Sequence, residues 1–536
     1  MLLALLASTA AFADAPDNWK FSLDGYYRVR GYAFYNLFEG QAAPGTYMTH
    51  RIRMQPGLNF EDRAKFFMTL NLLDGVVFGD NESLASTALF AGDPSYTGVD
   101  GLEVDPIKLS RVWMEFKVPV GLLRVGRQSS NWGMGLLANG GDGFDDTFGE
   151  NQYGSTYDRV IFATRPITVA TTIANMVSGG KTKVQDVPLI AAVGVDRLVE
   201  DPLIQYYGYS CDATQGGDDP RCAGDEDHGF TVERDPENRS STWWVDGEDD
   251  VWEMVYVLRY SGEGLHLGGD TLGDITAGVY AVNRQQAETD SNVWILDGYT
   301  KVSIKNVYFE GEILHIGGDT HAITLADSDT VDPLEKKADI WGYVVKGGYQ
   351  SKAVDAIFEH GYASGDQKVN DKEFTGRPLH PDYNAGLLLY EEILARVTAD
   401  TWSEDAKGLW SNGGIYNSRY IFPTVKARPA PNWEIIGGFL VAWPDKPDGV
   451  RILCGTDDKV DCASPIDSPS AMLGYEADLA VKHKFHDHIN FTLEGGWAHA
   501  TNRLPLKNVG LAYETDDDGK EYGNYFTIQS RIAYEF

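Results

Sequence analysis

The connections between the extended segments of this chain limit its fold more than any other feature of the sequence. About eighteen segments alternate apolar and polar residues with a period of two, which is the pattern of β-strands with one apolar face. We predict strands at 20–35, 50–61, 64–78, 107–118, 121–130, 157–164, 167–177, 251–260, 273–284, 293–305, 306–316, 338–349, 353–363, 416–428, 432–442, 471–484, 489–499 and 523–536. The connections between these strands alternate in length along the chain.

Long connections, such as 79–106 and 364–415, are followed by short ones, such as 61–64 and 305–306. A soluble β-sandwich has no reason to sort its loops in this way, whereas a transmembrane barrel has tight periplasmic turns and long extracellular loops. An even number of strands also lets the last strand close against the first and leaves no open edge. The sequence therefore predicts an all-β fold, a transmembrane antiparallel β-barrel of about 18 strands, with about 16 as the alternative.

The last predicted strand runs to the final residue, although most soluble domains let their ends fray. One face of this strand carries Phe526, Ile528, Ser530, Ile532, Tyr534 and Phe536. We expect this face to meet lipid, with Tyr534 and Phe536 at the periplasmic interface, where aromatic residues lie at the hydrocarbon boundary. A terminal phenylalanine also resembles the signal by which outer-membrane barrels are recognised for assembly. The alternative is an edge strand of a soluble sheet.

The first residues predict export. A short apolar run precedes Ala11-Phe12-Ala13, which has the A-x-A pattern of a signal-peptide cleavage site. The basic region that normally opens such a peptide is missing, so we interpret 1–13 as a signal peptide whose start is late or truncated. The alternative is a buried N-terminal helix. Residues 14–536 are then a single outer-membrane β-barrel domain.

The charge of the chain limits its possible partners, and its cysteines indicate disulfides or a metal site. The net charge of −34 argues against nucleic acid, because an acidic chain repels polyanions. The four cysteines form two close pairs, Cys211 with Cys222 and Cys454 with Cys462, and an exported chain can form disulfides. Zinc is a weaker alternative, because the spacing is not C-x-x-C and only His228 lies close enough to complete a site.

If the apolar strand faces meet lipid, the opposite faces line the lumen. The early strands bring Arg28, Arg30, Arg51, Arg53, Arg111 and Arg159 to this side. The later strands bring Glu310, Glu312, Asp355, Glu359, Glu434, Glu476, Asp478 and Glu494. So many inward charges imply water or dense pairing, and a barrel of this size is too wide for side chains alone to fill. We predict a wet lumen with a basic wall and a more acidic one; the alternative is that the charges pair in ladders that brace the barrel.

One long connection, 131–156, has an unusual composition. Its glycines permit tight turns, and Leu136 and Leu137 would be out of place on an exposed loop. We expect this segment to fold into the lumen and narrow it. Its acidic residues, Asp142, Asp145, Asp146 and Glu150, supply clustered oxygen ligands for a calcium ion. The alternative to this metal site is an ordinary acidic turn, and no other cofactor is expected.

Three stretches carry a family resemblance: GRQSSNWGMGLLANGGDG, YDRVIFATRP and EHGYASGDQ. They resemble motifs of a family of uncharacterised long outer-membrane β-barrels of Gram-negative bacteria. More loosely, the chain resembles the alginate-export type of barrel, an eighteen-stranded pore with an arginine-rich lumen. The resemblance implies a pore in the outer membrane of a Gram-negative bacterium, without an established substrate. The acidic residues of the late strands differ from the lining that a pore for polyanions alone would have.

Together these observations predict a porin-like channel for passive diffusion or export of small or charged hydrophilic solutes. Its expected surroundings are outer-membrane lipid and lipopolysaccharide, with a homotrimer or another protein partner at the loops. An enzyme is disfavoured, because the chain has neither G-x-S-x-G nor H-E-x-x-H. The main alternative is a structural or adhesive barrel whose long loops, 178–250 and 364–415, bind a partner.

Overall fold

A computed structural model describes residues 18–78, 107–144, 147–152, 154–200, 251–262, 266–267, 270–271, 273–287, 290–320, 336–367, 372–400, 411–446 and 469–536. The predicted signal peptide and all four cysteines lie outside these residues, so the cleavage site and the two disulfides stay predictions.

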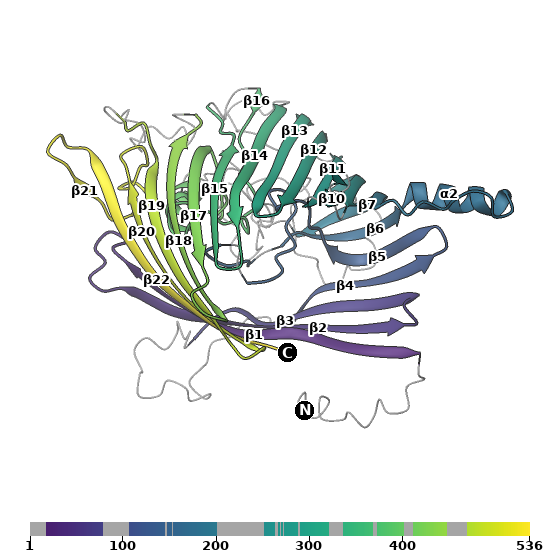
Figure 1. Ribbon diagram of the computed structural model, residues 1–536. Helices are drawn as coiled ribbons and strands as arrows, with labels where there is room; N and C mark the ends of the chain where they lie inside the picture. The colour runs from purple at the N-terminus through teal and green to yellow at the C-terminus, as the bar shows by residue number, and fades with distance from the viewer. Residues whose placement is uncertain are drawn as a thin grey trace, which may run out of the picture.

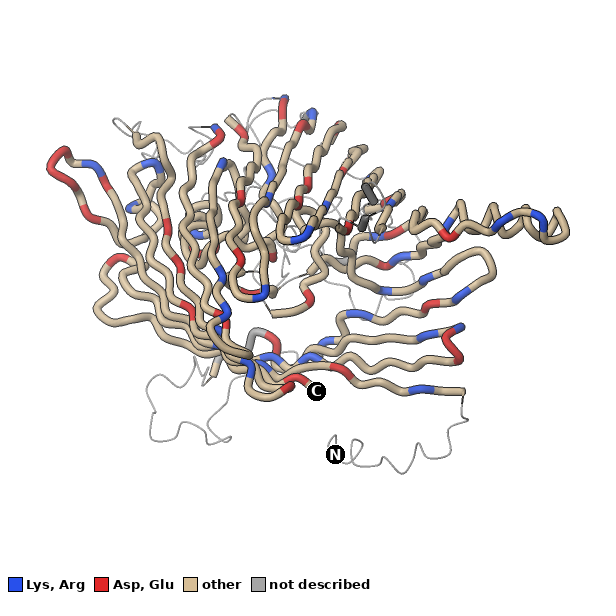
Figure 2. Tube along the Cα trace, viewed as in Figure 1, with Lys and Arg blue, Asp and Glu red and all other residues tan. Residues whose placement is uncertain are grey.

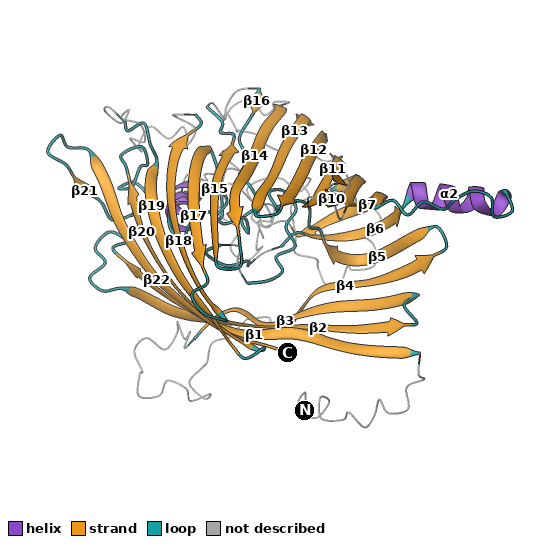
Figure 3. Ribbon diagram, in the orientation of Figure 1, coloured by secondary structure: helices purple, strands orange, loops and turns teal. Residues whose placement is uncertain are grey.

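Eighteen antiparallel strands in chain order form the wall of a closed barrel (Figures 1 and 3). The first nine are β1 (Trp19–Tyr35), β2 (Gly45–Phe60), β3 (Ala64–Val77), β4 (Ile107–Val118), β5 (Gly121–Ser129), β6 (Thr156–Thr164), β7 (Leu189–Glu200), β8 (Trp252–Gly262) and β11 (Gly273–Gln286). The others are β12 (Ser291–Ile304), β13 (Val307–Thr320), β14 (Lys336–Gln350), β15 (Val354–Ala363), β17 (Ser418–Ala427), β18 (Trp433–Pro444), β19 (Gly474–Phe485), β20 (Ile489–Ala500) and β22 (Glu521–Glu535). The predicted barrel of about 18 strands is confirmed.

The last strand closes the barrel. β22 pairs with β1 from Glu535 opposite Tyr26 to Phe526 opposite Tyr35. The terminal Phe536 extends this ladder, because its amide donates to the carbonyl oxygen of Gly25 at 3.0 Å. We call the end of the barrel that carries Phe536 and the tight turns the periplasmic end.

In the described part of the chain, four short strands lie outside the wall. The two-residue strands β16 (Glu373–Phe374) and β21 (Glu514–Thr515) pair with β14 and β22. In the connection between β8 and β11, β9 (His266–Leu267) pairs with β10 (Asp270–Thr271).

The outer face of the wall is apolar, as the alternation predicts. In β22, Phe526, Ile528, Ile532 and Tyr534 are about half exposed, whereas the odd-numbered residues from 527 to 533 on the other face are buried. The same division recurs around the barrel, where large apolar side chains stay exposed on one face of most strands. Such a surface is stable only in contact with lipid, so the barrel belongs in an outer membrane.

One predicted strand is wrong. Residues 167–177 form the helix α2 (Pro166–Val177), and the strand that lies between β6 and β8 is β7. The β-branched residues of this segment favour a strand, but two signals favour a helix: a proline in the first turn and a glycine pair just after the last turn. Gly180, with a φ of +86°, donates its amide to the carbonyl oxygen of Asn175 at 2.9 Å and ends the helix.

The helix changes the connections on both sides of it. The link between β6 and β7, residues 165–188, is long although it lies at the periplasmic end. The predicted external loop 178–250 therefore loses its first part, because residues 189–200 belong to the wall. The strand count stays the same because one missed strand replaces one wrong strand. No helix in the described segments combines the length and the apolar character needed to cross a membrane.

Three connections from the opposite end of the barrel fold inward. We call residues 130–155, 364–417 and 501–520 the first, second and third inward loops. Each contributes fully buried residues to one apolar cluster, for example Leu136, Leu388 and Leu506. The second loop also contains a π-helical turn, Leu389–Leu394, and α3, Ala395–Asp400 (Figure 3). The main apolar core of the protein thus lies inside the barrel, where these loops pack on the inner faces of the strands.

Candidate functional site

A ladder of arginines runs along the inner face of the first and last strands. Arg28 of β1 lies opposite Arg51 of β2, and Arg30 of β1 lies opposite Arg531 of β22. Strands β2, β4 and β6 add Arg53, Arg111 and Arg159. All seven are buried, with exposed fractions of 3–6%. Buried like charges face one another only where a counter-charge holds them, and here the first inward loop supplies it.

Glu150 of the first inward loop is the centre of this arrangement. Its carboxylate is bound by Arg28, by Arg30 with Nη1 to Oε2 at 3.0 Å, and by Arg531 with Nη1 to Oε2 at 3.7 Å. The Glu150 side chain is 1% exposed. One loop carboxylate therefore joins three arginines from the two strands that close the barrel.

A second contact between loop and wall lies nearer the start of the same loop. Asp142 Oδ1 is 2.8 Å from Arg111 Nη1 and 3.3 Å from Arg53 Nη1. Arg53 and Arg111 also donate to the carbonyl oxygens of Gly141 and Gly140. Unlike Glu150, the Asp142 side chain is 53% exposed, so it borders open space.

Arginines also bind the first loop near both of its ends, where it joins β5 and β6. Arg51 donates to the carbonyl oxygen of Gln152 at 3.0 Å and pairs with Asp74. Arg159 donates to Ser130 Oγ at 3.1 Å and pairs with Asp196 of β7. The described part of the first loop is thus fixed to the basic wall, which confirms that this loop folds into the lumen.

Carboxylates on the other strands hold the loops by a different chemistry. Glu312 of β13 accepts the amides of Met134 and Leu136, the latter at 3.2 Å. Glu476 of β19 accepts three successive amides of the second loop, from Leu387, Leu388 and Leu389, at 2.5, 2.8 and 2.6 Å. Because these backbone donors have no strand partner, each carboxylate acts as a clamp on an irregular segment.

Other acidic residues of this wall are bound by tyrosines and by basic residues. Glu359 accepts the hydroxyls of Tyr383 and Tyr420 at 3.0 and 2.6 Å. Glu310 is bound by Tyr299 and Tyr308. Asp355 pairs with Arg428, whose Nε also binds Glu434 at 3.0 Å.

The structure therefore brings the predicted pore-lining residues to the inner side but covers most of them. Thirteen of the fourteen are buried, and Glu434 is the partly exposed one. Where we expected a wet lumen between two charged walls, the inward loops form an apolar cluster with the inner faces of the strands. Water and solute are left with the space around partly exposed groups such as Asp142 and with the periplasmic cavities.

The predicted calcium ligands separate in the structure. Glu150 and Asp142 bind different arginines, and Asp145 and Asp146 lie outside the described residues. Within the part of the chain that is described, no group of three or more acidic, histidine or cysteine side chains is placed to hold a metal ion. Calcium binding stays a prediction.

Arg531 lies on the polar face of the last strand, from which alternation predicts an inward side chain. Two other residues of the site were not predicted. Gln529 lies on the same face and could have been selected by the same alternation, whereas Phe144 carries no such signal. Its ring packs against Tyr26, with centroids 4.8 Å apart, and lies 4.6 Å from the guanidinium carbon of Arg531.

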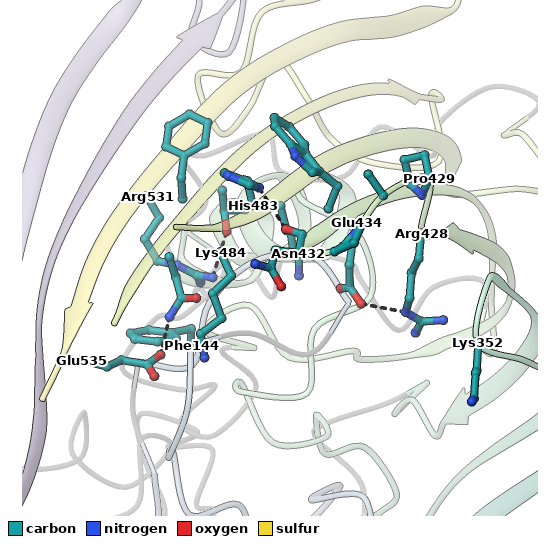
Figure 4. A pocket seen from close by; sticks show the side chains of 17 residues that line it. Phe144, Lys352, Arg428, Pro429, Asn432, Glu434, His483, Lys484, Arg531 and Glu535 are labelled. Carbon is teal, nitrogen blue, oxygen red and sulfur yellow. Dashed lines mark hydrogen bonds and ion pairs between the residues drawn. The ribbon is translucent and has the colours of Figure 1, made fainter. Parts of the chain in front are cut away.

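A cavity of 710 Å³ opens at the periplasmic end beneath the first inward loop (Figure 4). Phe144 and Arg531 form part of its wall. Its charged lining consists of Lys352, Arg428, Lys482, Lys484 and Arg531 against Glu434 and Glu535. This vestibule therefore carries an excess of basic groups, which attracts anions.

A second cavity, of 770 Å³, lies at the periplasmic ends of β3 to β7. Its charged lining consists of Arg63, Lys65, Lys117 and Arg165 against Asp62 and Glu115. Both periplasmic cavities are thus more basic than acidic, although the whole chain carries a charge of −34. Acidic positions gather elsewhere, for example on the hairpin between β21 and β22 (Figure 2).

The second inward loop carries two adjacent carboxyl groups, Glu391 and Glu392. Burial raises the pKa of Glu392 from its ordinary value of 4.5 to about 7, although the positive charge of Arg30 partly opposes the rise. Burial and the negative charge of Glu392 together raise the pKa of Glu391 well above its ordinary value. The loop therefore gains negative charge near neutral pH.

This titration predicts a pH dependence of stability. A carboxyl group whose pKa is higher in the folded state favours folding while it is protonated and opposes folding once it ionises. The free energy of unfolding should therefore fall as the pH rises from about 4.5 to about 7, the range between the ordinary and the folded pKa of Glu392. Urea unfolding at several pH values measures this change. The slope should become shallower in Glu392→Gln, and an equal slope in wild type and variant would contradict the assignment.

No protein-family model and no curated protein matches the sequence. Among solved structures, the chain is similar to the outer membrane channel DcaP of Acinetobacter baumannii, with 10% identity, a TM-score of 0.36, and 97% and 99% of the two chains covered. It is also similar to OccAB1 of Acinetobacter baumannii, with 9% identity, a TM-score of 0.45, and 96% and 97% covered. OccK8 (OprE) of Pseudomonas aeruginosa shows 7% identity, a TM-score of 0.44, and 96% and 98% covered. At these identities the likeness concerns the fold alone.

Proposed function

We propose that the protein is a narrow channel of the outer membrane for small charged hydrophilic solutes, with a preference for anions. The observation that carries the proposal is the excess of arginine around the first inward loop. Among the described residues of this loop, two carboxylates, Glu150 and Asp142, meet the arginines at positions 28, 30, 531, 53 and 111, and Glu494 of β20 lies 3.9 Å from Arg30. The basic excess of both periplasmic cavities supports the same preference, since like-signed walls concentrate counter-ions.

The inward loops limit the size of the solute. They fill the barrel with an apolar cluster, so a wide pore for a polymer is not part of the proposal. The clamping carboxylates Glu312 and Glu476 also do not suit a path for polyanions such as alginate. Small ions and metabolites that pass through the space beside Asp142 and through the periplasmic cavities are the solutes that this geometry favours.

The alternative of an adhesive barrel has less support. One of its two loops, 364–415, is the second inward loop, whose described part is buried inside the wall. Of the other, 178–250, residues 178–188 lie at the periplasmic end, residues 189–200 form β7, and residues 201–250 lie outside the described residues.

The first test of the proposal is charge selectivity. We expect the double substitution Arg51→Ala and Arg53→Ala to shift the selectivity toward cations, because the lumen loses two positive charges while Asp74 and Asp142 remain. The measurement is the reversal potential of the purified protein in a planar bilayer with a salt gradient. Arg127→Ala is the matched control, because Arg127 pairs with Asp158 on an exposed face of the wall. A reversal potential that does not move in the double variant would show that these arginines do not border the ion path.

A further inference from the structure

The helix α2 and the segment that returns from it to β7 project from the periplasmic end of the wall (Figure 1). Figure 1 shows them extending beyond the ends of β6 and β7, with free space around the far end. None of the twelve residues of the helix is buried. A helix this short is marginal in water by itself, so it requires a surface that covers its apolar side.

The polar side of the helix is already occupied. Thr168, Thr171 and Ser178 lie along one stripe and bind the returning segment, for example Gln185, whose amide donates to Thr171 Oγ1 at 3.1 Å. At the base, Arg165 pairs with Asp186 at 2.9 Å. These contacts join the helix to the returning segment along its polar side and leave its apolar side uncovered.

The opposite side of the helix is apolar and open. Met176 and Val177 are 74% and 84% exposed, and Ile173 and Val184 are also exposed. The helix itself contains no charged residue. Water is a poor environment for such a tip, so the tip is expected to be in contact with an apolar phase.

The charge of this unit identifies that phase. Residues 165–188 contain Arg165, Lys181 and Lys183 but one acidic residue, Asp186, in a chain whose net charge is −34. Beyond the acidic position, Figure 2 shows further basic positions toward the far end of the segment. Two lysines beside an apolar helix tip match the requirements of an anionic lipid surface, in which apolar side chains enter the acyl boundary and lysines bind phosphates. The unit also continues directly from β6, whose outer face, with Val160 about half exposed, already meets lipid.

We propose that α2 and its returning segment, residues 165–188, form a lipid-binding arm that rests on the phospholipid of the periplasmic leaflet. The apolar tip with Met176 and Val177 enters the acyl boundary, and Lys181 and Lys183 bind anionic headgroups. The arm fixes the depth and tilt of this side of the barrel, and this role does not depend on the proposed transport.

Site-specific photo-cross-linking tests the arm. The full-length protein carries p-benzoylphenylalanine at position 176 and is reconstituted into phosphatidylethanolamine vesicles with or without phosphatidylglycerol. The matched control has the same group at Arg63, on a periplasmic turn, because the side chain there is 76% exposed. We expect lipid adducts several times more often at position 176 than at position 63, and more often again when phosphatidylglycerol is present.

A charge reversal separates lipid binding from chance contact. Lys181→Glu with Lys183→Glu should abolish the increase caused by phosphatidylglycerol and leave the single-channel conductance unchanged. Equal lipid labelling at positions 176 and 63 would overturn the proposal. So would labelling of a protein in place of lipid when the same experiment is done in native outer membranes, because the arm would then be a protein-docking element.

Discussion

Replacing Glu150 with alanine is expected to raise the single-channel conductance several-fold and to lower the stability of the barrel. The substitution leaves Arg28, Arg30 and Arg531 buried without their shared counter-charge. Breaking a buried ion pair by removing one partner costs about 3–5 kcal/mol, and here three cations lose the same partner. The first inward loop should therefore leave the basic wall and widen the path. Planar-bilayer conductance and urea unfolding in detergent measure the two effects.

Asp142→Asn is the matched comparison for this variant. Asp142 also contacts two arginines of the ladder, but its side chain is half exposed and solvent can replace it. We expect a small change in selectivity and little change in stability. If Glu150→Ala conducts and unfolds like the wild-type protein, the loop is not held by its buried carboxylate and the described constriction is wrong.

Replacing Glu476 with alanine should cause the second large loss of stability. Glu476 is completely buried, and its two carboxylate oxygens accept the amides of Leu387, Leu388 and Leu389. Each donor that is left unsatisfied in a buried position costs about 1–3 kcal/mol. The second inward loop should consequently detach from β19, and its apolar residues should become accessible. Urea unfolding and proteolysis of the native barrel measure these changes.

Two further substitutions isolate the role of this clamp. Glu476→Gln keeps one acceptor oxygen and should lose less stability than alanine does. Glu434→Ala removes a partly exposed carboxylate that pairs with Arg428, and its effect should stay within about 1 kcal/mol. Equal losses for Glu476→Ala and Glu434→Ala would mean that burial of the three amides does not depend on the clamp.

The architecture of the wall could be predicted from sequence because two simple rules govern it. Alternation along a strand assigns Phe526 to lipid and Arg531 to the interior, and the structure agrees. The even strand number follows from the loop lengths, and the pairing of β22 with β1 follows from closure. Alternation acts between neighbouring residues of one strand, and closure acts on the chain as a whole. Neither rule requires knowledge of which side chains touch.

Two local patterns were misread around β5 and β6. Residues 167–177 contain enough β-branched residues to imitate a strand, and the signals at Pro166 and Gly180 were given too little weight. The alternation in β5 is the second such pattern, because it places either Arg124 or Arg127 on the apolar face and so favours a bulge. The β4–β5–β6 ladders have no register shift there. Instead, Arg124 pairs with Glu115, and Arg127 pairs with Asp158.

The site was only half predictable, for a physical reason. Strand alternation shows that Arg28 and Glu476 point inward, but it gives no information about what meets them there. The partner of Arg28 is 122 residues away in the sequence, and the partners of Glu476 are backbone amides of a loop. A pattern of inward charges is the same for an open, wet lumen and for a lumen filled by loops. Only the leucines at 136 and 137 indicated the second outcome, and they indicated it for one loop.

The position of Glu150 also has a consequence for the order in which the barrel matures. Its partners include residues of the first strand and of the last strand, and Arg30 and Arg531 face each other across the closing pair. The loop can reach its full set of partners only after the final strand has been added. The Glu150 cluster is therefore complete only when the wall is complete, and an assembly intermediate that lacks β22 holds Glu150 through the arginines of β1 alone.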